Sequence, residues 1–170
     1  GAAVPYAIAA KFCHSDRPVV AMVGDGAMQM NNMAELITVA KYWNQWQNSQ
    51  WICCVFNNED LNQVTWEQRV MAGDPKFEAS QNIPNVPYHR FAESIGLKGI
   101  YVDREDQVAA AWDEAFGADR PVLIEFKTDP NVPPLHRTSR WNRPRRMRRC
   151  CCAAMILTNA ACSFNRPSRC

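Results

Sequence analysis

Two kinds of hydrophobic pattern alternate along the first 127 residues. Short runs of consecutive apolar residues alternate with stretches in which apolar residues recur every three or four positions. The runs are typical of strands that are buried on both faces of a parallel sheet, and the stretches are typical of amphipathic helices. The expected strands are 19–23, 51–56, 99–102 and 122–127, and the expected helices are 4–12, 33–40, 88–95 and 106–116. Strands that alternate with helices predict an α/β fold, a doubly wound and mostly parallel sheet with helices on both faces.

Residues 57–87 interrupt this alternation. The segment is rich in proline and glycine, and we expect a long loop with short helical pieces around 65–71. Before it, Asn32 is expected to cap the helix at 33–40. Loops of this length inside a compact domain are usually functional or disordered, so the segment is a candidate to close over a site.

Charge divides the 170-residue chain into two segments that the overall net charge of +2 conceals. Residues 1–135 hold all 17 carboxylates and ten of the 19 basic residues, a net charge of −7. Residues 136–170 hold nine arginines and five of the eight cysteines, a net charge of +9. We therefore expect a domain at 1–135 and a basic, cysteine-rich tail at 136–170 that is disordered or aberrant. Arginines attract phosphate, so a phosphate or nucleic-acid binding module is an alternative function, but the tail's lack of periodicity argues against a nucleic-acid partner.

The apolar runs are too short for a membrane protein. The longest, such as 19–23 and 150–157, fall far below the roughly 20 residues that span a bilayer. Cys53 and Cys54 lie in a strand-like run and are expected to be buried free thiols, which favours a reducing, cytoplasmic setting. The chain opens on Gly1 without a signal-peptide pattern, and we expect a fragment that is truncated at the amino end.

Polar residues follow two of the expected strands directly. Gly24-Asp25-Gly26 comes after 19–23, and Asn57-Asn58 comes after 51–56. Sites in parallel sheets form at the carboxyl ends of the strands, where these loops lie. Glycines permit close approach of a ligand, a helix N-terminus suits phosphate, and carboxylate and amide oxygens suit Mg²⁺. From these residues alone the alternative is that Asp25 caps a turn and the asparagines form an ordinary loop.

The two motifs, with thirty residues between them, resemble the GDG…NN signature of thiamine diphosphate enzymes. The resemblance covers about residues 1–134 and is to the carboxy-terminal, diphosphate-binding domain of the pyruvate oxidase and acetolactate synthase group. The segments that carry it include RPVVAMVGDGAMQMNNMAELITVAKY, WICCVFNNEDLNQVTWEQR and RPVLIEFKTDPNVPP. It implies thiamine diphosphate and Mg²⁺ as cofactors, with FAD possible in the full-length enzyme. It also implies decarboxylation of a 2-oxo acid such as pyruvate.

The resemblance implies roles for individual residues of both loops. Asp25 and Asn58 would ligate Mg²⁺ through side-chain oxygens, and the backbone carbonyl of Asp60 would be the third protein ligand. The other residues of the expected cofactor site are Gly24, Gly26, Ala27, Leu61 and Asn62. Glu59 and Asp60 stand where the commoner pattern has glycine soon after the asparagines. These carboxylates could point outward, or Asp60 could contribute to the metal directly.

No catalytic residue is assigned within the chain. In the family that it resembles, the glutamate that protonates the cofactor belongs to an amino-terminal, pyrimidine-binding domain, usually of a neighbouring subunit. We expect that domain to be missing here and to come from a second subunit of a homodimer or homotetramer. The isolated chain is therefore expected to be inactive and to bind thiamine diphosphate weakly.

A second resemblance connects the GDG loop with Mg-dependent phosphatases of the haloacid-dehalogenase type. That family places another aspartate shortly after GDG, where this chain has Ala27, Met28 and Gln29. It also needs a nucleophilic aspartate in an upstream D-x-D loop, whereas Asp16 is the only earlier aspartate. The sequence therefore favours the thiamine diphosphate domain.

Overall fold

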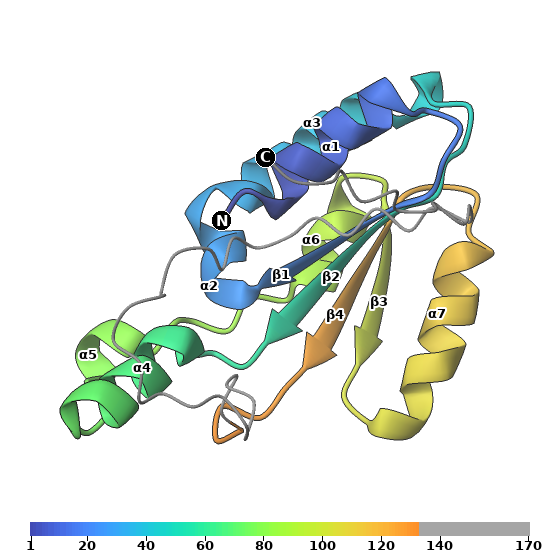
Figure 1. Ribbon diagram of the computed structural model, residues 1–170. Coiled ribbons are helices and arrows are strands. Elements are labelled where there is room, and N and C mark those ends of the chain that lie inside the picture. The colour runs from blue at the N-terminus through green and yellow to red at the C-terminus, as the bar shows by residue number, and fades with distance from the viewer. Residues whose placement is uncertain (133–170) are drawn as a thin grey trace, which may run out of the picture.

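The structure, a computed structural model, describes residues 1–132 and contains one four-stranded sheet in that range (Figure 1). Its strands are β1 (Val19–Gly24), β2 (Trp51–Asn57), β3 (Lys98–Val102) and β4 (Val122–Lys127). The spatial order is β1-β2-β4-β3, and all three neighbouring pairs are parallel. The expected parallel sheet is confirmed, and each strand lies where an apolar run predicts it. The predicted tail, residues 136–170, lies outside the described residues.

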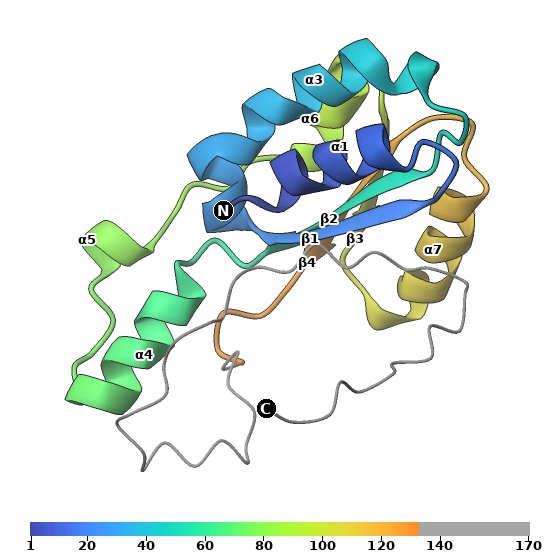
Figure 2. The same ribbon diagram turned by 45° about the horizontal axis from the view of Figure 1, so that its top comes forward.

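Helices cover both faces of the sheet (Figures 1 and 2). The α-helices are α1 (Ala3–Cys13), α2 (Asp25–Ala27), α3 (Met33–Tyr42), α4 (Asn62–Ala72), α5 (Glu78–Gln81), α6 (Tyr88–Ser94) and α7 (Val108–Phe116). Buried residues of α1, α3 and α6 form one core with the sheet, and α7 forms the core on the opposite face. Across residues 1–132 there is no helix of the length and apolarity that a membrane span requires.

The strand order explains why α7 lies alone on its face. The chain moves in one direction across the sheet from β1 to β2 and on to β3, and it then reverses to place β4 between β2 and β3. Crossovers between parallel strands are right-handed, so a reversal of direction puts the connecting helix on the other face. The helix of the reversed connection is α7, and the expected doubly wound arrangement is confirmed.

Alternating side chains of the central strands fill the two cores. On β2, Cys53 and Val55 face the layer of α1, α3 and α6, whereas Ile52 and Cys54 face α7. Both cysteines are buried and free, as predicted, and burial raises the pKa of the Cys54 thiol to about 12. These thiols are therefore packing residues that stay protonated and unreactive.

The helix after the GDG loop begins earlier than the sequence predicts. It starts at Asp25, passes through a π-helical turn at Met28–Asn32 and continues as α3, so the prediction that Asn32 caps a helix at 33–40 is wrong. Asn32 is instead fully buried inside the helix. Its Oδ1 accepts the N–H of Val4 at 3.0 Å, and its Nδ2 donates to the carbonyls of Gly1 at 3.0 Å and Ala27 at 2.6 Å. The side chain therefore ties the first turn of α1 to the helix that carries the GDG motif.

Residues 57–87 are more helical than expected, since α4 and α5 occupy much of the segment. The two helices form an arm that projects from the body beyond the carboxyl end of β2 (Figure 1). Gly73, at a φ of 73°, ends α4 in the left-handed conformation that glycine adopts readily. At the base of the arm, Leu61 N donates to Gln81 O at 2.8 Å and Ile83 N donates to Glu59 O at 3.2 Å. These hydrogen bonds join the two ends of the arm beside the Asn57-Asn58 turn.

Lys11, in the last turn of α1, is fully buried, and its Nζ donates to the carbonyls of Ser15 and Arg17. Burial lowers the pKa of Lys11 from 10.5 to about 8. Between pH 8 and 10.5 the unfolded chain therefore binds more protons at this site than the folded chain, and the free energy of unfolding rises with pH. We expect Lys11→Met to remove up to about 3 kcal/mol of this rise, measured by urea unfolding across that range. Lys41→Met, at an exposed lysine in the last turn of α3, should leave the pH dependence as it is in the wild type.

Candidate functional site

The side chain of Asp25 joins the two polar loops at the carboxyl edge of the sheet. Its Oδ1 accepts the N–H of Gly26 at 2.8 Å, and its Oδ2 accepts the N–H groups of Asn58 at 2.9 Å and Glu59 at 2.6 Å. The loops meet because β1 and β2 are neighbouring parallel strands that end at the same level, with Gly24 paired to Phe56. One carboxylate therefore organises the backbone of both motifs.

Asp25 holds its carboxylate in a largely dry environment, since only 3% of the residue is exposed. Burial raises the pKa of Asp25, and the backbone N–H groups that it accepts lower that pKa in part. A buried carboxylate of this kind is stabilised by a nearby positive charge. A carboxylate has about four lone-pair sites, and the backbone hydrogen bonds use both sites of Oδ2 and one of Oδ1, so Oδ1 keeps one site for a cation.

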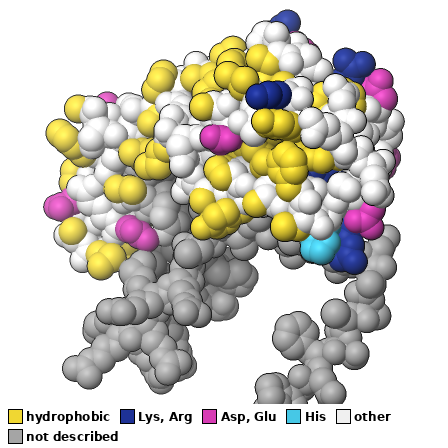
Figure 3. All heavy atoms as spheres, turned by 90° about the horizontal axis from the view of Figure 1, so that it is seen from above, with side chains coloured by type: hydrophobic (Ala, Val, Ile, Leu, Met, Phe, Trp, Pro, Cys, Tyr) yellow, Lys and Arg dark blue, Asp and Glu magenta, His cyan; other side chains and the backbone are white. Residues whose placement is uncertain are grey.

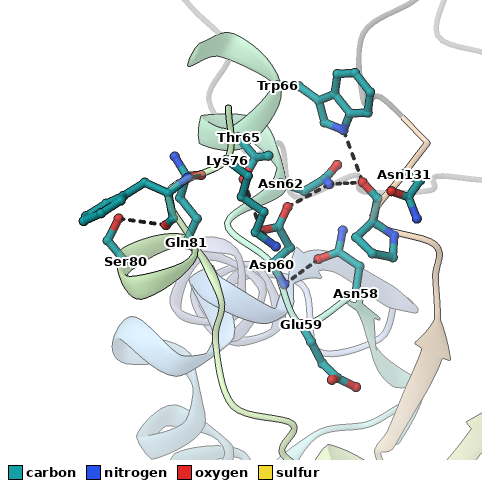
Figure 4. A network of polar contacts seen from close by, with 12 residues as sticks. Asn58, Glu59, Asp60, Asn62, Thr65, Trp66, Lys76, Ser80, Gln81 and Asn131 are labelled. Carbon is teal, nitrogen blue, oxygen red and sulfur yellow. Dashed lines mark hydrogen bonds and ion pairs between the residues drawn. The ribbon is translucent and has the colours of Figure 1, made fainter. Parts of the chain in front are cut away.

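Asn58, Glu59 and Asp60 form a tight turn (Figure 4), and the first two donate their N–H groups to Asp25. The Oδ1 atom of Asn58 accepts the N–H of Asp60 at 3.1 Å, which fixes the direction of the amide. The side chain of Asp60 is buried and turns toward the arm, where it accepts from Thr65 Oγ1 and Asn62 Nδ2 at 3.1 Å each. It also pairs with Lys76 Nζ at 2.7 Å. These contacts occupy the Asp60 carboxylate. The backbone carbonyl is therefore the Asp60 group that is left as a candidate metal ligand.

Glu59 turns the other way, and its carboxylate pairs with Lys127 at the end of β4. Its backbone has a φ of 57°, a left-handed conformation that costs a non-glycine residue about 1–2 kcal/mol. The hydrogen bonds of its N–H to Asp25 and of its carbonyl to Ile83 hold it in this conformation. The two carboxylates that replace the commoner glycine thus each have their own lysine, which limits their repulsion of an anionic ligand.

The remaining residues of the expected cofactor site divide into two groups. Gly26 lies in the first turn of the helix and touches Leu61 so closely that a Cβ at Gly26 would come within 2.6 Å of Leu61 Cδ2. Ala27 follows Gly26 in the same turn and is half-buried. Gly24 ends β1 with open space around it, and Asn62 donates to the carbonyl of Pro130 at 2.7 Å. The structure therefore places Gly26 against Leu61, with Ala27 next to Gly26, whereas Asn62 is engaged with Asp60 and Pro130.

Tyr88 holds the backbone of Asp25, and Gln29 in turn holds Tyr88; the sequence did not predict either contact. The Tyr88 hydroxyl donates to the backbone carbonyl of Asp25 at 3.3 Å and accepts from Gln29 Nε2 at 2.8 Å. Gln29 also donates to the carbonyl of Pro84 at 3.0 Å. Burial raises the pKa of Tyr88 to about 12, so the hydroxyl keeps its proton near neutral pH. These residues are far apart in the chain, and no local pattern marks them as partners.

The oxygen atoms at this edge of the sheet suit a hard cation. The expected ligands are the Asp25 carboxylate, the Asn58 amide oxygen and the Asp60 carbonyl, and hydrogen bonds link these residues, from Asn58 N–H to Asp25 and from Asp60 N–H to Asn58 Oδ1. In residues 1–132 there is no group of three or more His, Cys, Asp or Glu side chains placed to hold a metal. Mg²⁺ does not need such a group, because it commonly uses one or two protein groups together with ligand phosphates. The donor set, the close Gly26–Leu61 approach and the helix N-terminus fit a Mg²⁺–diphosphate group.

Sequence comparison shows the family of the chain. The profile of the family described as "Thiamine pyrophosphate enzyme, C-terminal TPP binding domain" matches residues 1–126. The chain therefore belongs to the thiamine pyrophosphate enzymes, and the matching part is their C-terminal cofactor-binding domain. It is 35% identical over 135 residues to YdaP of Bacillus subtilis, a relative whose name describes it as a thiamine pyrophosphate-containing protein. It is 34% identical over 140 residues to a probable acetolactate synthase large subunit from Methanococcus aeolicus.

These alignments cover 79% of the chain but only 22% of each of the two relatives, so the chain spans about a fifth of their length. A solved structure shares the fold with a TM-score of 0.64 and 23% identity, covering 75% of this chain and 23% of the other. That structure is a thiamine diphosphate-dependent 4-hydroxybenzoylformate decarboxylase from Rhodococcus jostii RHA1. The predicted resemblance to thiamine diphosphate enzymes is confirmed, and the comparisons give no support to the phosphatase alternative.

Proposed function

We propose that the chain is the Mg²⁺- and diphosphate-binding part of an enzyme that decarboxylates a 2-oxo acid such as pyruvate, similar to pyruvate oxidase or acetolactate synthase. The observation that carries this proposal is the buried Asp25 carboxylate, which joins the GDG loop to the Asn57-Asn58 turn. It gives a cation one charged ligand next to an amide oxygen and a carbonyl, at the edge of the sheet where ligands bind.

In this proposal Asp25 and Asn58 hold Mg²⁺ through side-chain oxygens, and Asp60 does so through its backbone carbonyl. Gly26 and Ala27 lie in the first turn of the helix, where backbone N–H groups attract phosphate oxygens. Tyr88 keeps the Asp25 backbone in place through its carbonyl. When bound, thiamine diphosphate supplies the electron sink for decarboxylation, and this domain supplies binding and orientation.

The rest of the active site is proposed to come from elsewhere. We infer a separate pyrimidine-binding domain, contributed by a second subunit of a homodimer or homotetramer. Apolar side chains on the outer surface of α1, α3 and the π-helical turn before α3 support a subunit contact, since Tyr6, Phe12, Met30 and Ile37 are 52–75% exposed. Figure 3 shows apolar side chains gathered over these helices. The proposal leaves open the use of FAD in the full-length enzyme. It includes a cytoplasmic setting, which the free cysteines Cys13, Cys53 and Cys54 support.

Calorimetric titration of thiamine diphosphate into the 170-residue chain tests the proposal. Binding should be weak and should fall by more than about tenfold when EDTA removes Mg²⁺. A truncated chain of residues 1–135 should bind in the same way. The alternative of phosphate or nucleic-acid binding through the arginine-rich tail predicts the opposite, namely binding that ignores Mg²⁺ and disappears on truncation.

A further inference from the structure

Glu125 is a buried carboxylate in the middle of an apolar strand, and the proposed metal site does not use it. It lies on β4 between Ile124 and Phe126, points to the face covered by α1, α3 and α6, and is 2% exposed. Ionised groups are almost never buried to this extent without polar partners. The partners of Glu125 therefore indicate what it does.

Both oxygens of Glu125 accept hydrogen bonds from segments that border the candidate site. Oε1 accepts from Asn57 Nδ2 at 2.7 Å. Oε2 accepts from the backbone N–H of His89 at 3.1 Å and lies 2.5 Å from the Nδ1 atom of the same residue. His89 follows Tyr88 in the first turn of α6, and Tyr88 contacts the Asp25 carbonyl. One side chain thus contacts the last residue of β2 and the helix that supports Asp25.

Glu125 fixes the orientation of the Asn57 amide. A carboxylate accepts hydrogen bonds only, so Asn57 must turn its NH₂ group toward Glu125. The same NH₂ group donates to Asn85 Oδ1 at 3.1 Å. Within the described part of the chain, the Oδ1 atom of Asn57 is buried without a hydrogen-bond partner. The Asn57 oxygen therefore makes no hydrogen bond that could fix the amide, and the contact between its NH₂ group and Glu125 sets the orientation of the side chain.

Asn57 leads directly into the turn that would carry the metal ligands. It is 1% exposed, its side chain contacts Glu125 of β4, and its carbonyl accepts the N–H of Thr128, the residue after β4, at 2.9 Å. The next two N–H groups, of Asn58 and Glu59, donate to Asp25. We propose that Glu125 is a positioning residue for the metal-binding turn, acting through Asn57 and the first turn of α6. This inference rests on the proposed function, and it adds a buried carboxylate of β4 to the residues that make the site work.

Glu125→Gln tests the inference with a side chain of the same size. Glutamine cannot accept hydrogen bonds at both ends, so it loses either the Asn57 or the His89 contact unless neighbouring amides rearrange. Groups that hold metal ligands in place typically contribute 10–100-fold to metal affinity, and we expect a loss of about that size in the Mg²⁺ dependence of thiamine diphosphate binding. Glu114→Gln is the matched control, because Glu114 pairs with Lys98 on the surface of α7 with 53% of its side chain exposed.

A readout without cofactor separates this inference from the proposed function. In ¹⁵N NMR spectra of the metal-free chain, Glu125→Gln should shift the backbone amide signals of Asn58 and Glu59, whereas Glu114→Gln should not. Unshifted signals in Glu125→Gln would overturn the positioning role, whether or not the wild type binds cofactor. Absence of Mg²⁺-dependent binding in the wild type would count against the proposed function alone.

A second variant covers the case in which Glu125→Gln does not fold. Asn57→Asp combined with Glu125→Gln exchanges the carboxylate and the amide between the two positions. The introduced glutamine can then donate to the introduced aspartate and still accept from the N–H of His89. This double variant should fold and restore the Asn58 and Glu59 signals toward their wild-type positions. If it folds no better than Glu125→Gln alone, the contact between these two side chains does not hold the turn.

Discussion

Replacing Asp25 with asparagine should lower the Mg²⁺-dependent affinity for thiamine diphosphate by about 100-fold or more, equivalent to roughly 3 kcal/mol. Asparagine removes the charge that would face the cation. It also replaces one acceptor oxygen with an NH₂ group in a site where three backbone N–H groups point at the side chain. The metal ligand and the organisation of the Asn57-Asn58 turn are therefore lost together. Calorimetric titration of thiamine diphosphate at a series of Mg²⁺ concentrations measures the effect.

Asp106→Asn is the control for this experiment, because Asp106 pairs with Arg104 on the surface with 73% of its side chain exposed. It should bind cofactor like the wild type. Circular dichroism should show the α/β fold in both variants, since Asp25 lies at the edge of the sheet rather than in either core. An Asp25→Asn chain that keeps wild-type Mg²⁺ dependence would refute the metal assignment.

The sequence predicts the sheet well because its strands are short apolar runs between clear breaks. It predicts the helix after β1 poorly. Gly24-Asp25-Gly26 has the composition of a loop, yet the helix begins at Asp25, where the Asp25 carboxylate accepts the N–H of Gly26. The wide π turn then buries Asn32, whose polar side chain suggests a helix cap. In both cases contacts with distant backbone override the local preference.

For the site, chain position alone places the GDG and NN loops at the same edge of the sheet. The supporting residues come from distant parts of the chain, as Tyr88 lies 63 residues from Asp25 and Lys127 lies 68 residues from Glu59. No periodicity marks such pairs. Glu125 is the exception, since a carboxylate inside the apolar run at 122–127 signals a buried polar contact. The sequence therefore indicates that Glu125 has a partner but not which residue the partner is.

Lys76→Met should destabilise the arm formed by α4 and α5 by about 3 kcal/mol. Lys76 lies between these helices and pairs with Asp60 at 2.7 Å, with 21% of the lysine side chain and 1% of the aspartate side chain exposed. Methionine keeps the apolar stem but leaves the Asp60 carboxylate buried with only its neutral donors, Thr65 and Asn62. Removing one partner of a buried pair is costly because the other charge stays behind without compensation. Hydrogen exchange of residues 62–81 and urea unfolding of the chain measure the loss.

Two further variants show whether the uncompensated charge is the cause. Asp60→Asn combined with Lys76→Met removes both charges and should recover most of the lost stability. Lys98→Met breaks the exposed pair with Glu114 and should cost no more than about 1 kcal/mol. If Lys76→Met costs no more than Lys98→Met, the Asp60 carboxylate does not need its lysine. If the larger cost is found, Lys76 explains how this chain has aspartate where the commoner pattern has glycine. The lysine compensates the buried charge on the side of the turn that faces the arm, and the Asp60 carbonyl keeps the role proposed for it at the metal.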